Sequence, residues 1–295
     1  MIKQQFHEVD HVFPNFLGIG VERGGTTWLW SILKEHPQIY LCSFLKEIKF
    51  FDKNFQKGLQ WYAKFFPSEA EAKNYQAIGE ITPNYIFAEK VPERIQKYLS
   101  NTHFIIILRN PVNRAFSSYK YSILNEGIKE SFLEHLRKNE NEIKRGLYYQ
   151  QIKNWFNFFP RDRFLILIFE EIIKEPKKAF QEIAEFLNVD FNKFPFLNLD
   201  KKVNPSTNLP RFHKIYLFYQ RFLLFLKKKN LYDVYEKVIR LYLKIKDHVA
   251  SMPFIMRENV VEMNLETKKE LYTRYKEDIN KLEKLLNKDL SIWKE

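Results

Sequence analysis

Residues 15–35 read NFLGIGVERGGTTWLWSILKE. The first six residues form an apolar run that ends in glycine, which is typical of a buried β-strand. A glycine-rich loop follows, and from Thr26 the pattern favours a helix that continues to Glu35. Backbone N–H groups converge at the start of a helix, where the helix dipole also favours anions. The segment therefore predicts a strand, an anion-binding loop and a helix.

Strands and helices alternate through the first two-thirds of the chain. The apolar runs HFIIIL at residues 103–108 and FLILIF at residues 164–169 predict two more buried strands. Asn110 followed by Pro111 is typical of the start of a helix. Helices are predicted over residues 111–124, 149–158 and 176–187. This alternation predicts an α/β fold with a parallel sheet that is covered on both faces.

The composition excludes several classes of protein. Of the 295 residues, 45% are hydrophobic, so the chain can bury a large core and is not disordered overall. The single cysteine, Cys42, cannot form an internal disulfide or a cysteine-based metal site. The apolar runs are far shorter than the roughly 20 residues of a membrane span. The N-terminal residues also lack the apolar core of a secretory signal, so we expect a cytoplasmic protein.

Positive charge is concentrated in one part of the chain. The net charge is +12, and residues 201–250 hold 12 Lys and Arg against 3 Asp and Glu. Residues 214–229, KIYLFYQRFLLFLKKK, fit either a packed helix with a solvated basic edge or an amphipathic helix facing an anionic membrane or substrate. A further helix is predicted over residues 264–286. We expect one domain, 1–295, with an α/β core over about 1–200 and a helical acceptor-side part over about 201–295.

The glycine-rich loop has the spacing of a phosphate-binding loop but lacks the lysine of a nucleoside triphosphatase. Gly20 and Gly25 are separated by four residues, and Thr26 stands where such enzymes need a lysine for the β- and γ-phosphates. The nearest cation is Arg23, so the loop suits a monophosphate or a diester better than Mg·ATP. A P-loop NTPase or kinase remains an alternative, because the acidic pair at residues 170–171 follows a predicted strand.

Five segments, in order along the chain, resemble motifs of sulfotransferases that use 3′-phosphoadenosine 5′-phosphosulfate (PAPS), in particular the bacterial and glycan (heparan) branches. They are RGGTTWL at 23–29, KEIKFFD at 46–52, GEITPNY at 79–85, LRNPVNRAFS at 108–117 and the closing segment KLEKLLNKDLSIW at 281–293. The resemblance implies a P-loop-like three-layer sandwich with a central parallel sheet and a helical C-terminal part. It also implies transfer of a sulfuryl group from PAPS to an acceptor hydroxyl, which leaves adenosine 3′,5′-bisphosphate (PAP).

The same resemblance assigns residues to the donor. Arg109 and Ser117 match the residues that hold the 3′-phosphate, and an arginine fork can bind two phosphate oxygens at once. The alternative is that no ligand binds here, in which case Arg109 is a surface ion-pair residue and Ser117 a neutral helix residue. Trp28 matches an aromatic residue that packs on adenine, although a core tryptophan fits the position equally well. The expected 5′-phosphosulfate site consists of Arg23, Gly24, Gly25, Thr26 and Thr27.

For catalysis, Glu47 matches the residue that takes the acceptor proton, and Lys46 would stabilise the developing sulfonate charge. The alternative for this segment is a solvated helix start. Glu80 is a second carboxylate that could contact the substrate or Lys46. The sequence departs from the family pattern at Arg23, where lysine is usual, because arginine stabilises charge but is a poor proton donor. It also departs at Lys49, where histidine is often found.

The acceptor is less well defined by the sequence. Lys201 and Lys202, with Asn204 and Ser206, replace the family's late glycine-basic lid motif. The KEIKFFD segment favours a glycan or glycolipid over a phenol, and a contact with the inner face of the membrane is compatible with the basic segment. We expect no metal requirement and no nucleic-acid partner. The alternative is a protein that binds nucleic acid or membranes through residues 201–250.

Overall fold

The computed structural model describes residues 11–43, 45–194 and 262–294, together with isolated positions between 222 and 238. Lys201, Lys202 and most of the basic segment 201–250 lie outside the described residues. No helix in the part of the chain that is described is both long enough and apolar enough to cross a bilayer. The division of the chain near residue 200 stays a prediction.

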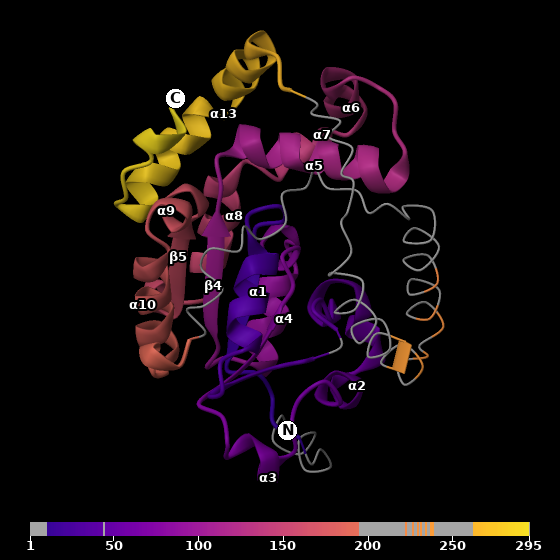
Figure 1. Cartoon of the computed structure of the whole chain (residues 1–295), viewed down its shortest axis with the longest axis vertical. Coiled ribbons are helices and arrows are strands. Elements are labelled where there is room, and N and C mark those ends of the chain that lie inside the picture. Colours follow the sequence, from indigo (N-terminus) through magenta and orange to yellow (C-terminus); the bar gives the residue numbers. More distant parts are fainter. Residues whose placement is uncertain are drawn as a thin grey trace, which may run out of the picture.

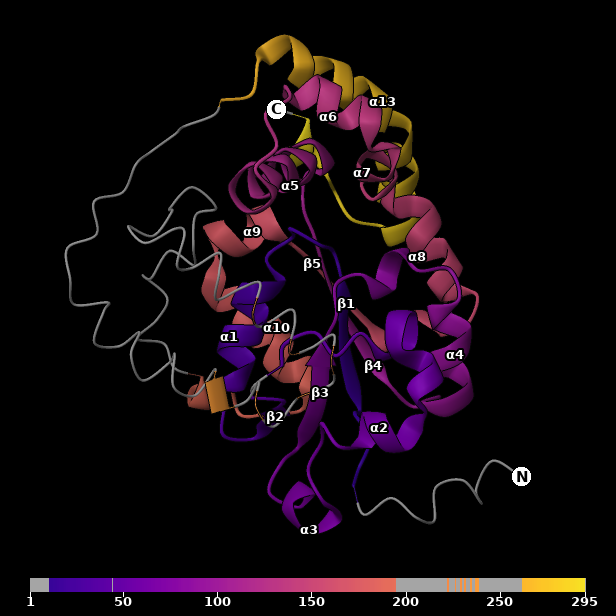
Figure 2. The same ribbon diagram turned by 90° about the vertical axis from the view of Figure 1, so that its right-hand side faces the viewer.

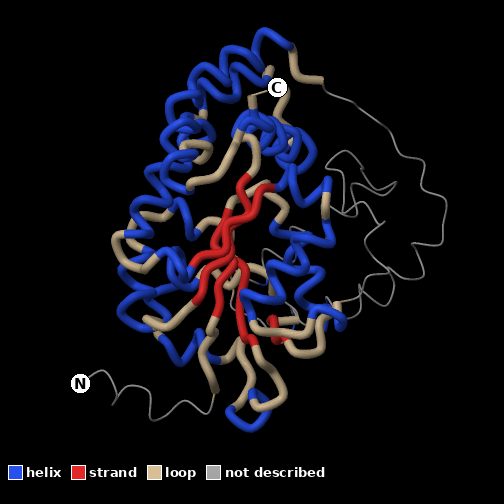
Figure 3. The backbone as a smooth tube through the Cα atoms, turned by 90° about the vertical axis from the view of Figure 1, so that its left-hand side faces the viewer, coloured by secondary structure: helices blue, strands red, loops and turns tan. Residues whose placement is uncertain are grey.

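Five parallel strands form the central sheet, in the order β2-β3-β1-β4-β5. The sheet lies in the middle of the molecule, among helices (Figure 1; Figure 3). The strands are β1 (Phe16–Gly20), β2 (Ile39–Leu41), β3 (Ala77–Ile81), β4 (His103–Leu108) and β5 (Phe164–Ile168). The sequence predicted β1, β4 and β5 and missed β2 and β3. The predicted end of β5 was wrong by one residue, because Phe169 begins the next helix.

Helices cover both faces of the sheet (Figure 2). Alternating side chains of β4 point to opposite faces, so Ile105 and Ile107 join one core while Phe104 and Ile106 join the other. The first core packs under α1 (Thr26–Lys34) and α10 (Pro176–Leu187), and the second under α4 (Val91–Tyr98) and α8 (Tyr148–Phe156). The predicted three-layer α/β sandwich is confirmed.

The remaining helices lie around the carboxyl end of the sheet and its flanks. The long α5 (Pro111–Glu126) and the C-terminal α13 (Leu265–Leu286) lie near this end, and α13 packs on α8 and α5 (Figure 2). The shorter helices are α2 (Leu59–Ala63), α3 (Glu69–Ala72), α6 (Phe132–Lys138), α7 (Glu140–Lys144) and α9 (Phe169–Lys174). Single 3-10 or π-helical turns span Phe50–Asn54, Phe55–Lys57, Tyr85–Phe87, Arg161–Arg163, Phe191–Lys193 and Ser291–Trp293.

The start of α5 is fixed by its own sequence. The Asn110 side chain accepts hydrogen bonds from the N–H groups of Val112 and Asn113, at 3.0 and 3.2 Å, and Pro111 is the first helical residue. Both features were predicted, because asparagine is a favoured N-cap and proline a favoured first helical residue. The adjacent β1 and β4 are parallel, with Leu17 opposite Phe104. The loop after β1 and the start of α5 therefore meet at one edge of the sheet.

Candidate active site

The loop between β1 and α1 passes very close to β4. A side chain on Gly24 would place its Cβ 2.6 Å from the Ile107 carbonyl oxygen, so only glycine fits there. Gly25 caps α1 with a φ of 102°, in the left-handed region that glycine adopts without strain. The two glycines thus bring the loop backbone and the start of α1 against the end of β4.

Two hydroxyl groups and the Lys46 ammonium group lie together at the N-terminus of α1. Thr26 is buried and Thr27 is exposed, and the first turn of the helix holds no acidic residue. The Lys46 Nζ lies 3.3 Å from the Oγ1 atom of each threonine. Burial lowers the pKa of Lys46, the Glu47 carboxylate raises it, and nearby Arg23 lowers it further. This arrangement suits an anion, which would join the positive end of the helix and the ammonium group.

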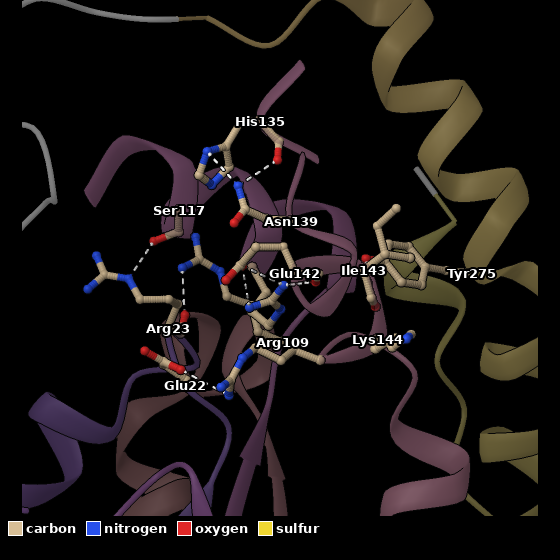
Figure 4. Close-up of polar contacts among 12 residues, drawn as sticks. Glu22, Arg23, Arg109, Ser117, His135, Asn139, Glu142, Ile143, Lys144 and Tyr275 are labelled. Atoms are coloured by element: carbon tan, nitrogen blue, oxygen red, sulfur yellow. Dashed lines mark hydrogen bonds and ion pairs between the residues drawn. The ribbon is translucent and has the colours of Figure 1, made fainter. Parts of the chain in front are cut away.

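Arg23 and Arg109 bring the two predicted phosphate sites into contact (Figure 4). The Arg23 Nε donates to the Ser117 Oγ at 3.4 Å, and an Arg109 terminal nitrogen donates to the Arg23 carbonyl oxygen at 3.0 Å. Ser117 is buried on the face of α5 that turns toward the loop. The sequence predicted each of these residues, and the structure places them side by side.

The Arg109 guanidinium lies over the Phe169 ring, 4.6 Å from its centre. Its Nε is buried and has no hydrogen-bond partner among the described residues. Burial lowers the pKa of Arg109, Glu170 raises it, and Arg23 and Arg114 lower it. A buried donor without a partner is costly, and a ligand oxygen would satisfy it. The site therefore fits an anionic group.

The backbone around Arg109 is held from several distant parts of the chain. The Tyr148 hydroxyl donates to the Arg109 carbonyl at 2.8 Å. The Glu170 carboxylate accepts from the Asn110 N–H at 3.0 Å and from the Trp293 indole N–H at 2.9 Å. The acidic pair at residues 170–171 was the reason to keep a P-loop NTPase or kinase as an alternative, and this use of Glu170 as an anchor for the loop weakens that interpretation. Its neighbour Glu171 forms an ion pair with Lys288 at 2.9 Å.

Glu47 lies between two lysines, beside the N-terminus of α1. Its Oε1 is 3.5 Å from the Lys46 Nζ, and its Oε2 is 3.0 Å from the Lys49 Nζ. The alternative of a solvated helix start is wrong, because Lys49 has a left-handed backbone with a φ of 56° and the helical turn begins only at Phe50. The carboxylate is therefore held next to the predicted 5′-phosphosulfate site.

Glu80 lies inside the protein, with 2% of its surface exposed. Its carboxylate accepts hydrogen bonds from the hydroxyls of Tyr62 and Tyr85, both at 2.8 Å, and of Thr82 at 3.1 Å. Burial raises the pKa of Glu80 to about 7, although these three hydrogen bonds oppose the shift. The expected contact with substrate or Lys46 was wrong, because these buried hydroxyls surround the carboxylate.

We expect Glu80 to make the fold less stable as the pH rises from about 5 to about 7. Its pKa is about 7 in the folded chain and about 4.3 in an unfolded one, so only the folded chain keeps this proton over the interval. The stabilisation is complete below about pH 4 and is lost as the pH rises through 7, with a change of about 4 kcal/mol at most.

Urea unfolding of the wild type and Glu80→Gln at pH 5, 6, 7 and 8 measures this effect. The free energy of unfolding of the wild type should fall relative to the variant over this range. Asp278, whose pKa burial raises to about 6, titrates in both proteins and cancels in the difference. Parallel curves for the two proteins would show that Glu80 is already ionised at pH 5.

A network that the sequence did not reveal connects the loop to the KEIKFFD segment. Arg145 lies 3.1 Å from the Glu22 carboxylate and donates to the Asn84 Oδ1 at 2.9 Å. The Asn84 Nδ2 donates to the Asp52 Oδ2 at 2.8 Å. Asn84 and Asp52 belong to the quoted motifs GEITPNY and KEIKFFD, so the motifs could have indicated their contact. Arg145 lies in neither motif, and nothing in the sequence pointed to it.

Trp28 packs edge-on against Phe180, with 5.7 Å between ring centres, and contacts the core under α1 and α10. This packing agrees with a core role, and stacking on adenine stays a prediction. The roles of Lys201 and Lys202 also stay predictions, since both lie outside the described residues.

Comparisons with known proteins agree on one family. The family model described as "Sulfotransferase domain" matches residues 14–215. Heparan sulfate glucosamine 3-O-sulfotransferase 5 of Mus musculus is 32% identical over 203 residues, which cover 63% of this chain and 57% of that protein. Heparan sulfate glucosamine 3-O-sulfotransferase 6 of Mus musculus is 30% identical over 185 residues, which cover 60% of this chain and 53% of that protein. The chain thus spans about half the length of the relatives that it matches.

Among solved structures, the chain is similar to a sulfotransferase from Alicyclobacillus acidocaldarius. The TM-score is 0.67 at 23% sequence identity, and the match covers 96% of this chain and 100% of the other. At this identity the likeness shows a shared fold.

Proposed function

Since this chain belongs to the sulfotransferase family, we propose that it transfers the sulfuryl group of PAPS to an acceptor hydroxyl and releases PAP. The observation that carries the proposal is the contact between two cationic sites. Arg23, at the N-terminus of α1, bonds to Ser117, and Arg109 bonds to the backbone of Arg23. PAPS carries a phosphate on the 3′ oxygen of its ribose and a phosphosulfate on the 5′ oxygen. Two adjoining cationic sites suit such a molecule.

The donor binds with its 5′-phosphosulfate at the start of α1. The backbone of Gly24 and Gly25, the hydroxyls of Thr26 and Thr27, and the Arg23 guanidinium supply hydrogen-bond donors there. Arg109 and Ser117 hold the 3′-phosphate, and the unpartnered Nε of Arg109 supports this assignment. Lys201 and Lys202 complete the proposed set of donor-binding residues, and Trp28 stacks on adenine.

The reaction is an in-line displacement at sulfur. The acceptor oxygen forms a bond to sulfur, and the bond between sulfur and the bridging phosphate oxygen breaks, which leaves its electron pair on PAP. Glu47 takes the acceptor proton, as a positioned carboxylate can do. Lys46 and Arg23 stabilise the negative charge on the transferred group and on the leaving oxygen, in the way that fixed cations stabilise related phosphoryl transfers.

A glycan or a glycolipid is the proposed acceptor. The names of the two relatives described above refer to heparan sulfate glucosamine, and the KEIKFFD segment places Glu47 between two lysines that would attract an anionic sugar. The reaction requires no metal, takes place in the cytoplasm and does not involve nucleic acid. Peripheral contact with the inner face of the membrane would occur through the basic segment 201–250.

Two measurements test this function. Transfer of labelled sulfate from PAPS should occur to a glycan or a glycolipid in a panel that also contains phenols. Titration calorimetry should show that PAP binds without magnesium and more tightly than Mg·ATP. Tighter binding of Mg·ATP, together with no sulfate transfer to any acceptor, would instead support the P-loop NTPase or kinase.

Arg23 is expected to tolerate lysine but not alanine. Arg23→Lys keeps the positive charge beside the leaving phosphate, so we expect kcat within about 10-fold of the wild type. Arg23→Ala should lower kcat by about 10²- to 10³-fold, which is the usual cost of losing one donor that stabilises developing charge. Steady-state rates of sulfate transfer measure both effects. Full activity in Arg23→Ala would rule out a role for this side chain in the reaction.

A further inference from the structure

We propose that Glu80 is a positioning residue, whose buried carboxylate orients the hydroxyls of Thr82 and Tyr85 so that they hold the backbone of the segment that carries Glu47. The proposal rests on the proposed function, because it assigns Glu80 a part in placing the base of that reaction. It differs from the contact with substrate that the sequence suggested for Glu80.

The hydrogen bonds form two short relays from β3 to the 46–52 segment. In the first, the Lys49 N–H donates to the Thr82 Oγ1 at 3.4 Å, and the Thr82 hydroxyl donates to the Glu80 Oε2 at 3.1 Å. In the second, the Phe51 N–H donates to the Tyr85 hydroxyl at 3.2 Å, which donates to the Glu80 Oε1 at 2.8 Å. One buried carboxylate thus supports two backbone groups that flank Phe50.

The direction of each relay requires an acceptor at Glu80. A backbone N–H can only donate, so each hydroxyl must turn a lone pair toward the segment and its single proton toward another group. Above its pKa of about 7, Glu80 is an ionised carboxylate, which offers only acceptor sites and can take both protons. An amide at the same position would offer one oxygen and one NH₂ group, so one of the two relays would lose its acceptor.

The 46–52 segment needs such support at Lys49. This residue has a φ of 56° and a ψ of 36°, a left-handed conformation that is unfavourable for a side chain other than glycine. Neighbouring contacts must therefore hold the conformation, and the N–H of Lys49 is the group that Thr82 accepts from. The Lys49 ammonium group in turn lies 3.0 Å from the Glu47 carboxylate. The left-handed turn thus fixes where that ammonium group meets Glu47.

Two tyrosines make a matched pair for the test. Tyr62 and Tyr85 are both fully buried, and both hydroxyls donate to the same Glu80 oxygen at 2.8 Å. The Tyr85 hydroxyl accepts from the Phe51 N–H, whereas the Tyr62 ring stacks on the Phe50 ring at 4.4 Å, a contact that phenylalanine would keep. Each Tyr→Phe change removes a single oxygen atom, and only Tyr85→Phe breaks a relay.

We expect Tyr85→Phe to lower kcat by at least about 10-fold, because small misplacements of a catalytic group cost up to about 10²-fold. Tyr62→Phe should keep kcat within about 3-fold, and both variants should bind PAP with nearly wild-type affinity, since the donor site is built on other elements. The other relay runs through the Thr82 hydroxyl. Thr82→Val should therefore behave like Tyr85→Phe, whereas Thr82→Ser keeps the hydroxyl and should retain the wild-type activity. This second pair gives the same comparison if Tyr85→Phe does not fold.

Hydrogen exchange of the peptide that covers residues 46–54 tests the relays without any assay of activity. Exchange in this peptide should be faster in Tyr85→Phe and Thr82→Val, and unchanged in Tyr62→Phe and Thr82→Ser. Equal changes in kcat and exchange for Tyr62→Phe and Tyr85→Phe would overturn the proposal, as would wild-type behaviour of both Tyr85→Phe and Thr82→Val. A wild-type protein that transfers no sulfate but shows the expected exchange pattern would refute the proposed function and leave the relays in place.

Discussion

Glu47→Gln is expected to lower kcat by about 10³-fold, within the range of about 10² to 10⁴ that a positioned general base contributes. The amide keeps the size of the side chain and can still accept from one of the two lysines through its oxygen, but it cannot take a proton from the acceptor. The affinity for PAP should stay within about 3-fold, because donor binding depends on Arg23 and Arg109. Rates of labelled sulfate transfer at saturating acceptor measure the first quantity, and titration calorimetry measures the second.

Glu89→Gln is the matched control for this change. Glu89 is exposed between the 3-10 turn Tyr85–Phe87 and α4, and its replacement should leave kcat within about 2-fold, as is usual for surface substitutions. If Glu47→Gln also kept the wild-type kcat, Glu47 would not be the base. The other carboxylate of the same segment, Asp52, would then be the next side chain to replace.

The parts of the fold that were predicted carry strong local signals. The glycine-rich loop, the β-branched run of β4 and the Asn110–Pro111 helix start each depend on a few adjacent residues. The strand β3 was missed because its sequence AIGEI contains a glycine and a glutamate, which are both unfavourable in strands. Gly79 is required there by the Phe16 ring, which lies 2.4 Å from where a Cβ would stand, and Glu80 is accommodated by hydroxyls from other elements.

In the candidate site, too, local motifs predicted the residues, but they did not predict the contacts between residues that are distant in the chain. Arg23, Glu47, Arg109 and Ser117 were each predicted because they lie in recognisable motifs. The bond between Arg23 and Ser117 could not be predicted from those motifs alone, because it depends on β1 and β4 being neighbours in the sheet. The support of Arg109 by Tyr148, Glu170 and Trp293 joins positions far apart in the chain, and no local pattern indicates such contacts.

Arg109→Ala should remove the preference of the protein for PAP over adenosine 5′-monophosphate, which lacks the 3′-phosphate. Loss of a buried cation that pairs with an anion typically costs about 2–5 kcal/mol, so we expect PAP to bind about 30- to 5 × 10³-fold more weakly. The monophosphate has no group for Arg109 to hold, and its affinity should change by less than about 5-fold. Calorimetric titration of both nucleotides into wild type and variant measures the change in preference directly.

Arg163→Ala controls for the loss of an arginine side chain near the sheet. Arg163 bonds to Asn101 and precedes β5, at the amino end of the strands, so its removal should leave both affinities as they are. Arg109→Lys separates charge from geometry, because lysine keeps the charge but lacks the planar fork, and we expect it to recover only part of the preference. If Arg109→Ala still preferred PAP as strongly as the wild type does, the 3′-phosphate would have to bind elsewhere. The unpartnered Nε of Arg109 would then need another explanation.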